Sequence, residues 1–86
     1  MGEVLVVINI YGRPNCTWCS AAQSLLDRKG FKYSYHNLFD MEPKQAQSVL
    51  DASGMKSVPI VNIDGTYIGG FDALEQYIRA AEERQM

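Results

Sequence analysis

The sequence predicts one α/β domain whose strands and helices follow the order βαβαββα. Its 86 residues suffice for one hydrophobic core, and we expect a single domain over residues 1–86. After a β-branched run near the start, segments with helical spacing of apolar residues alternate with segments of period-2 or short apolar runs. An Asp-Gly pair between two short strand-like runs predicts a tight hairpin in the C-terminal half. Together these observations predict a sheet packed against helices.

The N-terminal part of the chain opens with a strand and a helix. Residues Val4–Tyr11 are rich in β-branched side chains and apolar on both faces, which is typical of a central strand covered on both sides. A turn-forming segment, residues 12–15, ends this strand. From Cys16 onward apolar side chains recur at helical spacing, and Gly30 supplies the left-handed residue that stops a helix. We therefore expect a helix of about three to four turns.

A second strand is predicted at Phe31–Asn37, where aromatic and polar side chains alternate. A strand, helix and strand in this order form a right-handed parallel crossover when they share a sheet. The aromatic side chains of Phe31, Tyr33 and Tyr35 lie on one face of this strand, and we interpret them as packing groups. His36 lies on the opposite, polar face, where we expect a solvated side chain.

The C-terminal half contains a helix, a hairpin and a last helix. A weaker helical pattern covers Pro43–Ala52, and the hairpin joins strands at Ile60–Ile63 and Thr66–Ile68. The last helix has Asp72 at the position of an N-cap, and we expect the chain from Glu82 onward to be frayed. Its apolar stripe has the helical spacing and consists of Leu74, Tyr77, Ile78 and Ala81.

Charge and hydropathy exclude several classes of partner. The formal net charge is -2 with a pI near 5.2, and the basic residues are scattered, so we expect no nucleic-acid partner. The longest apolar run, Val4–Ile8, is too short to span a membrane, and Glu3 stands where a signal peptide carries positive charge. We therefore expect a cytoplasmic protein without membrane partners. In that reducing compartment, cysteines serve catalysis, redox sensing or metal binding more often than structural disulfides.

The two cysteines, Cys16 and Cys19, are separated by two residues at the start of the first predicted helix. Unpaired N–H groups and the positive end of the helix dipole stabilise a thiolate at Cys16 better than at Cys19. We predict that Cys16 is the nucleophile that attacks a substrate disulfide, and that Cys19 then resolves the mixed disulfide. Arg13, three residues earlier, is close enough in sequence to add positive charge near the thiolate.

Three other interpretations of the cysteine pair compete with redox chemistry. A structural disulfide would close a very small loop and remove little chain entropy. A zinc site needs four ligands, and two cysteines with the distant His36 cannot supply them unless two chains share the site. An inert pair in the core conflicts with the strand-to-helix corner at which Cys16 lies. We therefore favour redox chemistry and expect no bound metal.

Two further segments carry features that suit a ligand. Val58 and Pro59 precede the third strand, and a cis bond between them would turn the Val58 backbone outward, although the residues alone favour the commoner trans form. Gly69 and Gly70 lead into the last helix, whose free N–H groups suit a small carboxylate. Asp72 could hold an ammonium group, but its position alone favours a helix cap.

Taken in order along the chain, four motifs resemble those of the glutaredoxin family, and the small dithiol bacterial and viral members are the most similar. The motifs are Tyr11-Gly12-Arg13, Cys16-Thr17-Trp18-Cys19, Ser57-Val58-Pro59 and Gly69-Gly70-Phe71-Asp72-Ala73-Leu74. The resemblance extends over essentially the whole chain. It implies a thioredoxin-like fold with a four-stranded mixed sheet in the order 2-1-3-4, helices on both faces, and a cis bond before Pro59. It also implies a glutathione-disulfide oxidoreductase that reduces protein disulfides and glutathione mixed disulfides.

The resemblance also implies where glutathione, the reductant, binds. In the family the tripeptide lies between the cysteine pair, the residue before the cis-proline and the glycine turn. Trp18 occupies the place of an aromatic wall, Arg13 could meet the glycyl carboxylate, and Asp72 becomes a binder of the glutamyl end. The binding residues implied are Arg13, Trp18, Val58, Pro59, Gly70, Phe71 and Asp72, beside the catalytic Cys16 and Cys19.

Three residues depart from the commonest family pattern. Thr17 replaces a proline between the cysteines, Ala73 replaces a second aspartate, and Ile60 replaces a glutamine. In Ala73 and Ile60 the chain is similar to glutaredoxin-like redoxins that serve ribonucleotide reductase and are recycled by thioredoxin reductase. Ribonucleotide reductase and thioredoxin reductase are therefore candidate partners. Thr17 leaves open an alternative in which two copies and glutathione hold a [2Fe-2S] cluster. Otherwise we expect a monomer.

Overall fold

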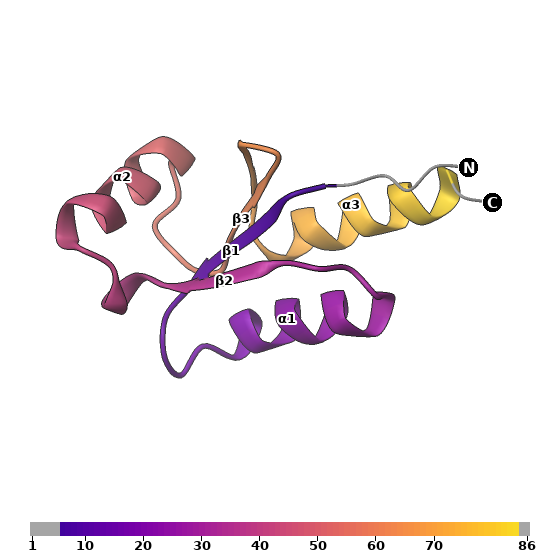
Figure 1. The fold of residues 1–86 in the computed structure, drawn as a ribbon, viewed down its shortest axis with the longest axis horizontal. Coiled ribbons are helices and arrows are strands. Elements are labelled where there is room, and N and C mark those ends of the chain that lie inside the picture. The colour runs from indigo at the N-terminus through magenta and orange to yellow at the C-terminus, as the bar shows by residue number, and fades with distance from the viewer. Residues whose placement is uncertain (1–5, 85–86) are drawn as a thin grey trace.

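The structure, a computed structural model, describes residues 6–84 and confirms the predicted α/β class (Figure 1). Its element order is βαβαββα, with one short 3₁₀ helix, η1, that the sequence did not predict. Along the chain the elements are β1 (Ile8–Gly12), α1 (Thr17–Lys29), β2 (Ser34–Asn37), η1 (Leu38–Asp40), α2 (Pro43–Ser53), β3 (Ile60–Ile63), β4 (Thr66–Gly69) and α3 (Phe71–Arg84).

The four strands form one mixed sheet in the order β2-β1-β3-β4, as the resemblance implied. β1 and β2 are parallel, whereas the β1–β3 and β3–β4 pairs are antiparallel. The parallel pair confirms the crossover through α1. Because β1 and β2 run in the same direction, Gly12 at the end of β1 pairs with Asn37 at the end of β2, and both strands deliver the chain to the same edge of the sheet.

The first strand is shorter than predicted. It begins at Ile8 and not at Val4, although residues 4 and 5 lie outside the described part of the chain. Val7 leaves the regular ladder but is held by Asp64, whose backbone N–H donates to the Val7 carbonyl and whose Oδ1 accepts from the Val7 N–H, both at 2.9 Å. A side chain therefore replaces one of the ladder bonds expected there.

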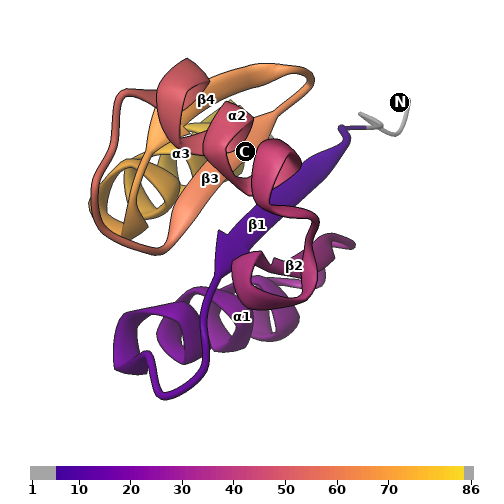
Figure 2. The same cartoon turned by 90° about the vertical axis from the view of Figure 1, so that its left-hand side faces the viewer.

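The hydrophobic core lies on the face of the sheet that α1 and α3 cover. Figure 1 shows α2 apart from both of these helices, and Figure 2 shows it from its own side of the molecule, where it packs beside β4. The apolar spacing read from the sequence explains this packing, because the core takes alternate residues of each strand and one stripe of each helix. The buried cluster consists of Ile8, Ile10, Ala22, Leu25, Leu26, Val61, Ile63, Leu74 and Ile78.

The opposite face of β1 and β2 carries a polar aromatic cluster, which corrects the expectation that His36 is solvated. Its ring stacks on Tyr11 with the centroids 4.8 Å apart, and its Nε2 lies 2.8 Å from Asn9 Oδ1. Partial burial raises the pKa of Tyr11 above its ordinary value, and neighbouring Tyr67 adds to this effect. Since Tyr11 and His36 are cross-strand partners, the cluster ties the two parallel strands together.

The ends of α1 and α3 differ in how well they match the prediction. Gly30 ends α1 with a φ of 79°, as predicted. The last helix begins at Phe71, and the Leu74 N–H donates to the Gly70 carbonyl at 3.1 Å, so Asp72 lies inside the first turn and is not the N-cap. The same helix continues to Arg84, which corrects the frayed tail expected from Glu82.

Within residues 6–84 no helix is long and apolar enough to cross a membrane.

Candidate active site

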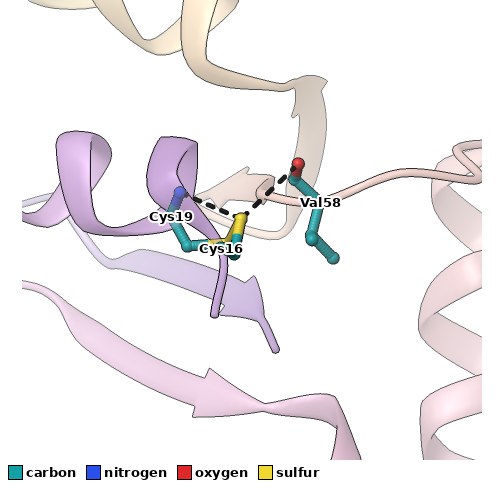
Figure 3. Close-up of a disulfide and its surroundings, with 3 residues drawn as sticks. All are labelled: Cys16, Cys19 and Val58. Atoms are coloured by element: carbon teal, nitrogen blue, oxygen red, sulfur yellow. Dashed lines mark hydrogen bonds between the residues drawn. A yellow bond between two sulfur atoms is a disulfide. The ribbon is translucent and has the colours of Figure 1, made fainter. Parts of the chain in front are cut away.

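The cysteine pair lies where β1 passes into α1. The connecting turn includes Asn15, whose positive φ of 59° reverses the chain direction after Gly12. Cys16 is the N-cap residue of α1 and Cys19 belongs to its first turn, with their Cα atoms 5.2 Å apart. Their sulfur atoms form a disulfide (Figure 3). The predicted spacing therefore does bring the two sulfurs together.

The Cys16 sulfur occupies the place that a capping oxygen takes in other helices. It accepts a hydrogen bond from the Cys19 N–H at 3.1 Å, which is one of the N–H groups that a helix leaves unpaired at its start (Figure 3). Cys16 is partly exposed, whereas Cys19 is 1% exposed. After reduction this arrangement stabilises a thiolate at Cys16, because the N–H group and the helix dipole both favour negative charge there.

A second backbone segment approaches the same sulfur from far along the chain. The Val58 carbonyl oxygen lies 4.0 Å from Cys16 Sγ, although 42 residues separate the two (Figure 3). The bond between Val58 and Pro59 is cis, as the resemblance implied. The Val58 backbone therefore borders the reactive sulfur.

A groove on this side of the disulfide, called here the Trp18 groove, gathers most of the predicted binding residues. It has a volume of about 380 Å³ and is lined by Trp18, Met55, Ser57, Val58, Pro59, Gly70, Phe71 and Asp72. Trp18 is 58% exposed and forms one wall with Phe71, the ring centroids lying 5.1 Å apart. Six predicted binding residues meet here. Met55 and Ser57 also line the groove but were not predicted to bind a ligand: Ser57 belongs to the Ser57-Val58-Pro59 motif, whereas no sequence pattern marks Met55.

At Gly70 the Trp18 groove has little room for a side chain. A Cβ atom at this position would lie 3.3 Å from the Pro59 carbonyl oxygen and 3.5 Å from Met55 Cε. Glycine therefore keeps open the space in front of the first turn of α3, where free N–H groups are available to a negatively charged ligand. Asp72 adds an exposed carboxylate at the same place.

A second groove, called here the Arg13 groove, lies on the other side of Cys16. It has a volume of about 660 Å³ and is lined by Arg13, Pro14, Asn15, Cys16, Thr17, Ser20, Tyr35 and Asn37. Arg13 therefore does not join the six residues of the Trp18 groove. No sequence pattern indicated that Ser20, Tyr35 and Asn37 line a groove beside the cysteines.

Metal-binding residues do not gather anywhere in the described chain. Among residues 6–84, no three histidine, cysteine, aspartate or glutamate side chains lie close enough to hold one metal ion. The site consists of a disulfide, two grooves and a helix N-terminus. Such an arrangement can exchange its disulfide with the thiols of another molecule that is held beside Cys16.

Comparisons with known proteins agree with this geometry. The sequence model described as Glutaredoxin matches residues 8–68, which include both cysteines and the cis-proline. The chain is 33% identical over 69 residues to an uncharacterized glutaredoxin-like 8.6 kDa protein in a rubredoxin operon of Clostridium pasteurianum, covering 80% of this chain and 91% of that protein. It is also 33% identical over 72 residues to Glutaredoxin 1 of Rickettsia felis, covering 83% and 71%.

A solved structure shows the same fold with a ligand. The crystal structure of a buckwheat glutaredoxin–glutathione complex matches with a TM-score of 0.74 and 28% identity, over 86% of this chain and 69% of that one. The family match covers most of the chain, and the cysteine pair, the cis-proline and the sheet order agree with it. The chain therefore belongs to the glutaredoxin family of thiol–disulfide oxidoreductases.

Proposed function

We propose that the protein is a glutathione-dependent dithiol oxidoreductase that reduces protein disulfides and glutathione mixed disulfides. The observation that carries this proposal is the meeting of three segments at one sulfur. Cys16 Sγ at the N-cap of α1 lies 4.0 Å from the Val58 carbonyl, and the Trp18 groove runs from Val58 to the N-terminus of α3. The buckwheat glutaredoxin that shares this fold was solved as a complex with glutathione, which supports the same ligand for this chain.

The residues of the Trp18 groove fit the chemistry of this tripeptide. Its γ-glutamyl end carries a carboxylate and an ammonium group, which suit the N–H groups after Gly70 and the carboxylate of Asp72, respectively. The cysteinyl backbone would pair with Val58, next to Cys16. The apolar wall of Trp18 and Phe71 would cover the middle of the ligand. A groove of about 380 Å³ lies within the usual range for small-molecule sites.

In the first step, the Cys16 thiolate attacks one sulfur of the substrate disulfide. A bond forms between Cys16 Sγ and that sulfur, the substrate S–S bond breaks, and the other substrate sulfur leaves as a thiolate that takes a proton from water. The N–H of Cys19, which lies 3.1 Å from Cys16 Sγ, stabilises the attacking charge.

In the second step, Cys19 attacks Cys16 Sγ and releases the remaining substrate sulfur as a thiol. This forms the Cys16–Cys19 disulfide that the structure contains. Two glutathione thiols then reduce this disulfide in two exchanges and leave as oxidised glutathione, so the electrons balance. With a glutathione mixed disulfide as substrate, Cys16 alone suffices, since a second glutathione resolves it.

Protein disulfides are the proposed substrate class, with ribonucleotide reductase as the candidate that the residues Ile60 and Ala73 suggest. A reducing compartment, the cytoplasm, would supply glutathione in the required form. The Trp18 groove supports glutathione as the electron source, because it offers partners for both ends of the γ-glutamyl group.

A coupled assay tests the source of electrons. NADPH oxidation is followed with a disulfide substrate in two reactions, one containing glutathione and glutathione reductase and the other containing thioredoxin reductase alone. We expect turnover in the first reaction that disappears when glutathione is omitted. Turnover with thioredoxin reductase and none with glutathione would contradict the proposal and favour the redoxin alternative.

A further inference from the structure

Tyr35 is the one residue of β2 that reaches both the core and the active-site edge. Its ring packs against the buried cluster, and its backbone is in register with Ile10 of β1. The same side chain also lines the Arg13 groove beside Cys16. Tyr35 therefore links the hydrophobic core to the groove beside Cys16.

The Tyr35 hydroxyl and the Cys19 sulfur approach the same point above the Cα atom of Gly12. A Cβ atom at Gly12 would overlap the Tyr35 hydroxyl oxygen and would approach Cys19 Sγ to 2.8 Å. The hydroxyl and the sulfur thus share the small space above the Cα atom of Gly12, which is free because glycine has no side chain. Cys16, the disulfide partner of Cys19, and Arg13 are the other ionisable residues that line the Arg13 groove.

Cys19 needs a hydrogen-bond donor once the disulfide opens. Its sulfur is buried, and its own backbone N–H is directed to Cys16 Sγ and not to Cys19 Sγ. A buried thiolate without a donor is strongly disfavoured, because it loses its solvation and gains nothing in return. Yet the resolving step requires Cys19 to react as a thiolate.

We propose that the Tyr35 hydroxyl donates a hydrogen bond to the Cys19 thiolate in the reduced protein and thereby sustains the resolving step. This inference rests on the proposed role of Cys19 as the resolving thiol. The Cys19 proton leaves through the hydroxyl side of the Arg13 groove to water. Cys19 Sγ then bonds to Cys16 Sγ, and the bond between Cys16 and the substrate sulfur breaks. The substrate sulfur departs as a thiolate and takes a proton from solvent.

The test measures Cys19 directly in a protein in which Cys19 is the remaining cysteine. In the Cys16→Ser variant, the ¹³Cβ chemical shift of Cys19 is followed by NMR as a function of pH, and its midpoint is compared with that of Cys16→Ser/Tyr35→Phe. Phenylalanine keeps the packed ring and removes the hydroxyl alone. We expect the midpoint to rise by about one pH unit, which is a tenfold smaller thiolate fraction at neutral pH.

Tyr33→Phe in the same background is the matched control. Tyr33 packs against the same core, but its hydroxyl donates to Gln23 Oε1 at 3.4 Å and so serves a different part of α1. We expect this substitution to leave the Cys19 midpoint unchanged. Equal midpoints for the Tyr35→Phe and Tyr33→Phe proteins would overturn the inference.

A second measurement separates this inference from the proposed function. With Cys16 intact, a single turnover of a substrate disulfide is followed. Release of the first substrate thiol reports attack by Cys16, and release of the second substrate thiol from the mixed disulfide reports the resolving step by Cys19. We expect Tyr35→Phe to slow the second release about tenfold at neutral pH and to leave the first unchanged, with the deficit disappearing at high pH. An equal slowing of both steps would indicate a structural role for Tyr35. Failure of Cys16→Ser to abolish the first step would contradict the proposed function instead.

Discussion

The two grooves beside the disulfide differ in where their residues come from and in what they offer. The Trp18 groove joins the start of α1, the segment before β3 and the start of α3, and it presents aromatic rings, backbone groups and the carboxylate of Asp72. The Arg13 groove is built around the β1–α1 turn and β2, and it presents a guanidinium group with hydroxyl and amide side chains. One side is the proposed site for the tripeptide beside Cys16, whereas the other includes Tyr35, on which the inference about Cys19 rests.

This difference assigns separate tasks to the two sides of one disulfide. Cys16 is partly exposed and lies 4.0 Å from Val58, which borders the Trp18 groove. Cys19 is buried, and Tyr35, which lines the Arg13 groove, approaches the same point above Gly12 as the Cys19 sulfur. Changes in the Trp18 groove should therefore alter substrate binding, and changes near Tyr35 should alter the second chemical step.

The largest effect is expected from the cysteines themselves. Cys16→Ser should abolish reduction of every disulfide substrate, because it removes the sulfur that the Cys19 N–H stabilises. Cys19→Ser should abolish turnover of protein disulfides by the dithiol route but should retain exchange of glutathione at Cys16. Both variants are compared in the glutathione-coupled NADPH assay with a protein disulfide and with a glutathione mixed disulfide. Turnover of protein disulfides by the Cys16→Ser protein would contradict the assignment of Cys16 as the nucleophile.

The next effect is on stability, at the point where the two cysteines meet β1 and β2. A methyl group at Gly12 would overlap Tyr35 and crowd Cys19, so Gly12→Ala should destabilise the fold by about 1 to 3 kcal/mol. Alanine also lowers the conformational entropy of the unfolded chain, which stabilises the protein by only about 0.4 to 1 kcal/mol, so we expect a net loss of stability. Urea unfolding followed by circular dichroism measures the difference.

A double variant sharpens this prediction. Adding Tyr35→Phe to Gly12→Ala removes the overlapping hydroxyl and should recover part of the lost stability, while the 2.8 Å approach to Cys19 remains. Strictly additive free energies of unfolding would show that the hydroxyl does not fill the space above Gly12. That result would also remove the geometric basis of the Tyr35 inference.

Most of the fold was predictable from local patterns, since each element had its own signal. The Asp-Gly hairpin, the Gly30 helix end and the parallel crossover are all present as predicted. The start of the last helix was misplaced because Asp72 is a good capping residue, yet Gly70 already accepts the first helical hydrogen bond. His36 was misread because a single strand does not show that its cross-strand partner is the Tyr11 ring.

The candidate site was predictable only where a motif marks it. The residues of the Trp18 groove came from motifs whose spacing is characteristic of the family. The resemblance implied that Arg13 meets the glycyl carboxylate, but the turn before Cys16 places Arg13 in the other groove. Tyr35 was correctly assigned to packing, but its nearness to Cys19 depends on the missing side chain of Gly12, and period-2 alternation carries no such information.

A smaller effect is expected from the Trp18 groove. Asp72→Asn keeps the size of the side chain and removes the charge that would hold the ligand ammonium group. It should raise KM for a glutathione mixed disulfide about tenfold while kcat changes little, because the lost contact is made equally in the ground and transition states. Asp51→Asn is the control, since Asp51 is an exposed residue of α2 that bonds Gln47. If Asp72→Asn and Asp51→Asn give the same KM, the groove does not hold the γ-glutamyl end.

The smallest effect, and the one that most directly compares the two grooves, is expected from Arg13. Arg13→Gln removes an exposed positive charge from the Arg13 groove, so it should leave KM for glutathione substrates unchanged. It should slow alkylation of Cys16 by a neutral reagent about two- to threefold at low salt, because exposed charges contribute little and are screened. Arg28→Gln makes the same charge change at the far end of α1 and should alter neither quantity. A raised KM in the Arg13→Gln protein would mean that the ligand reaches past Cys16 into both grooves and would contradict the separation of the two grooves.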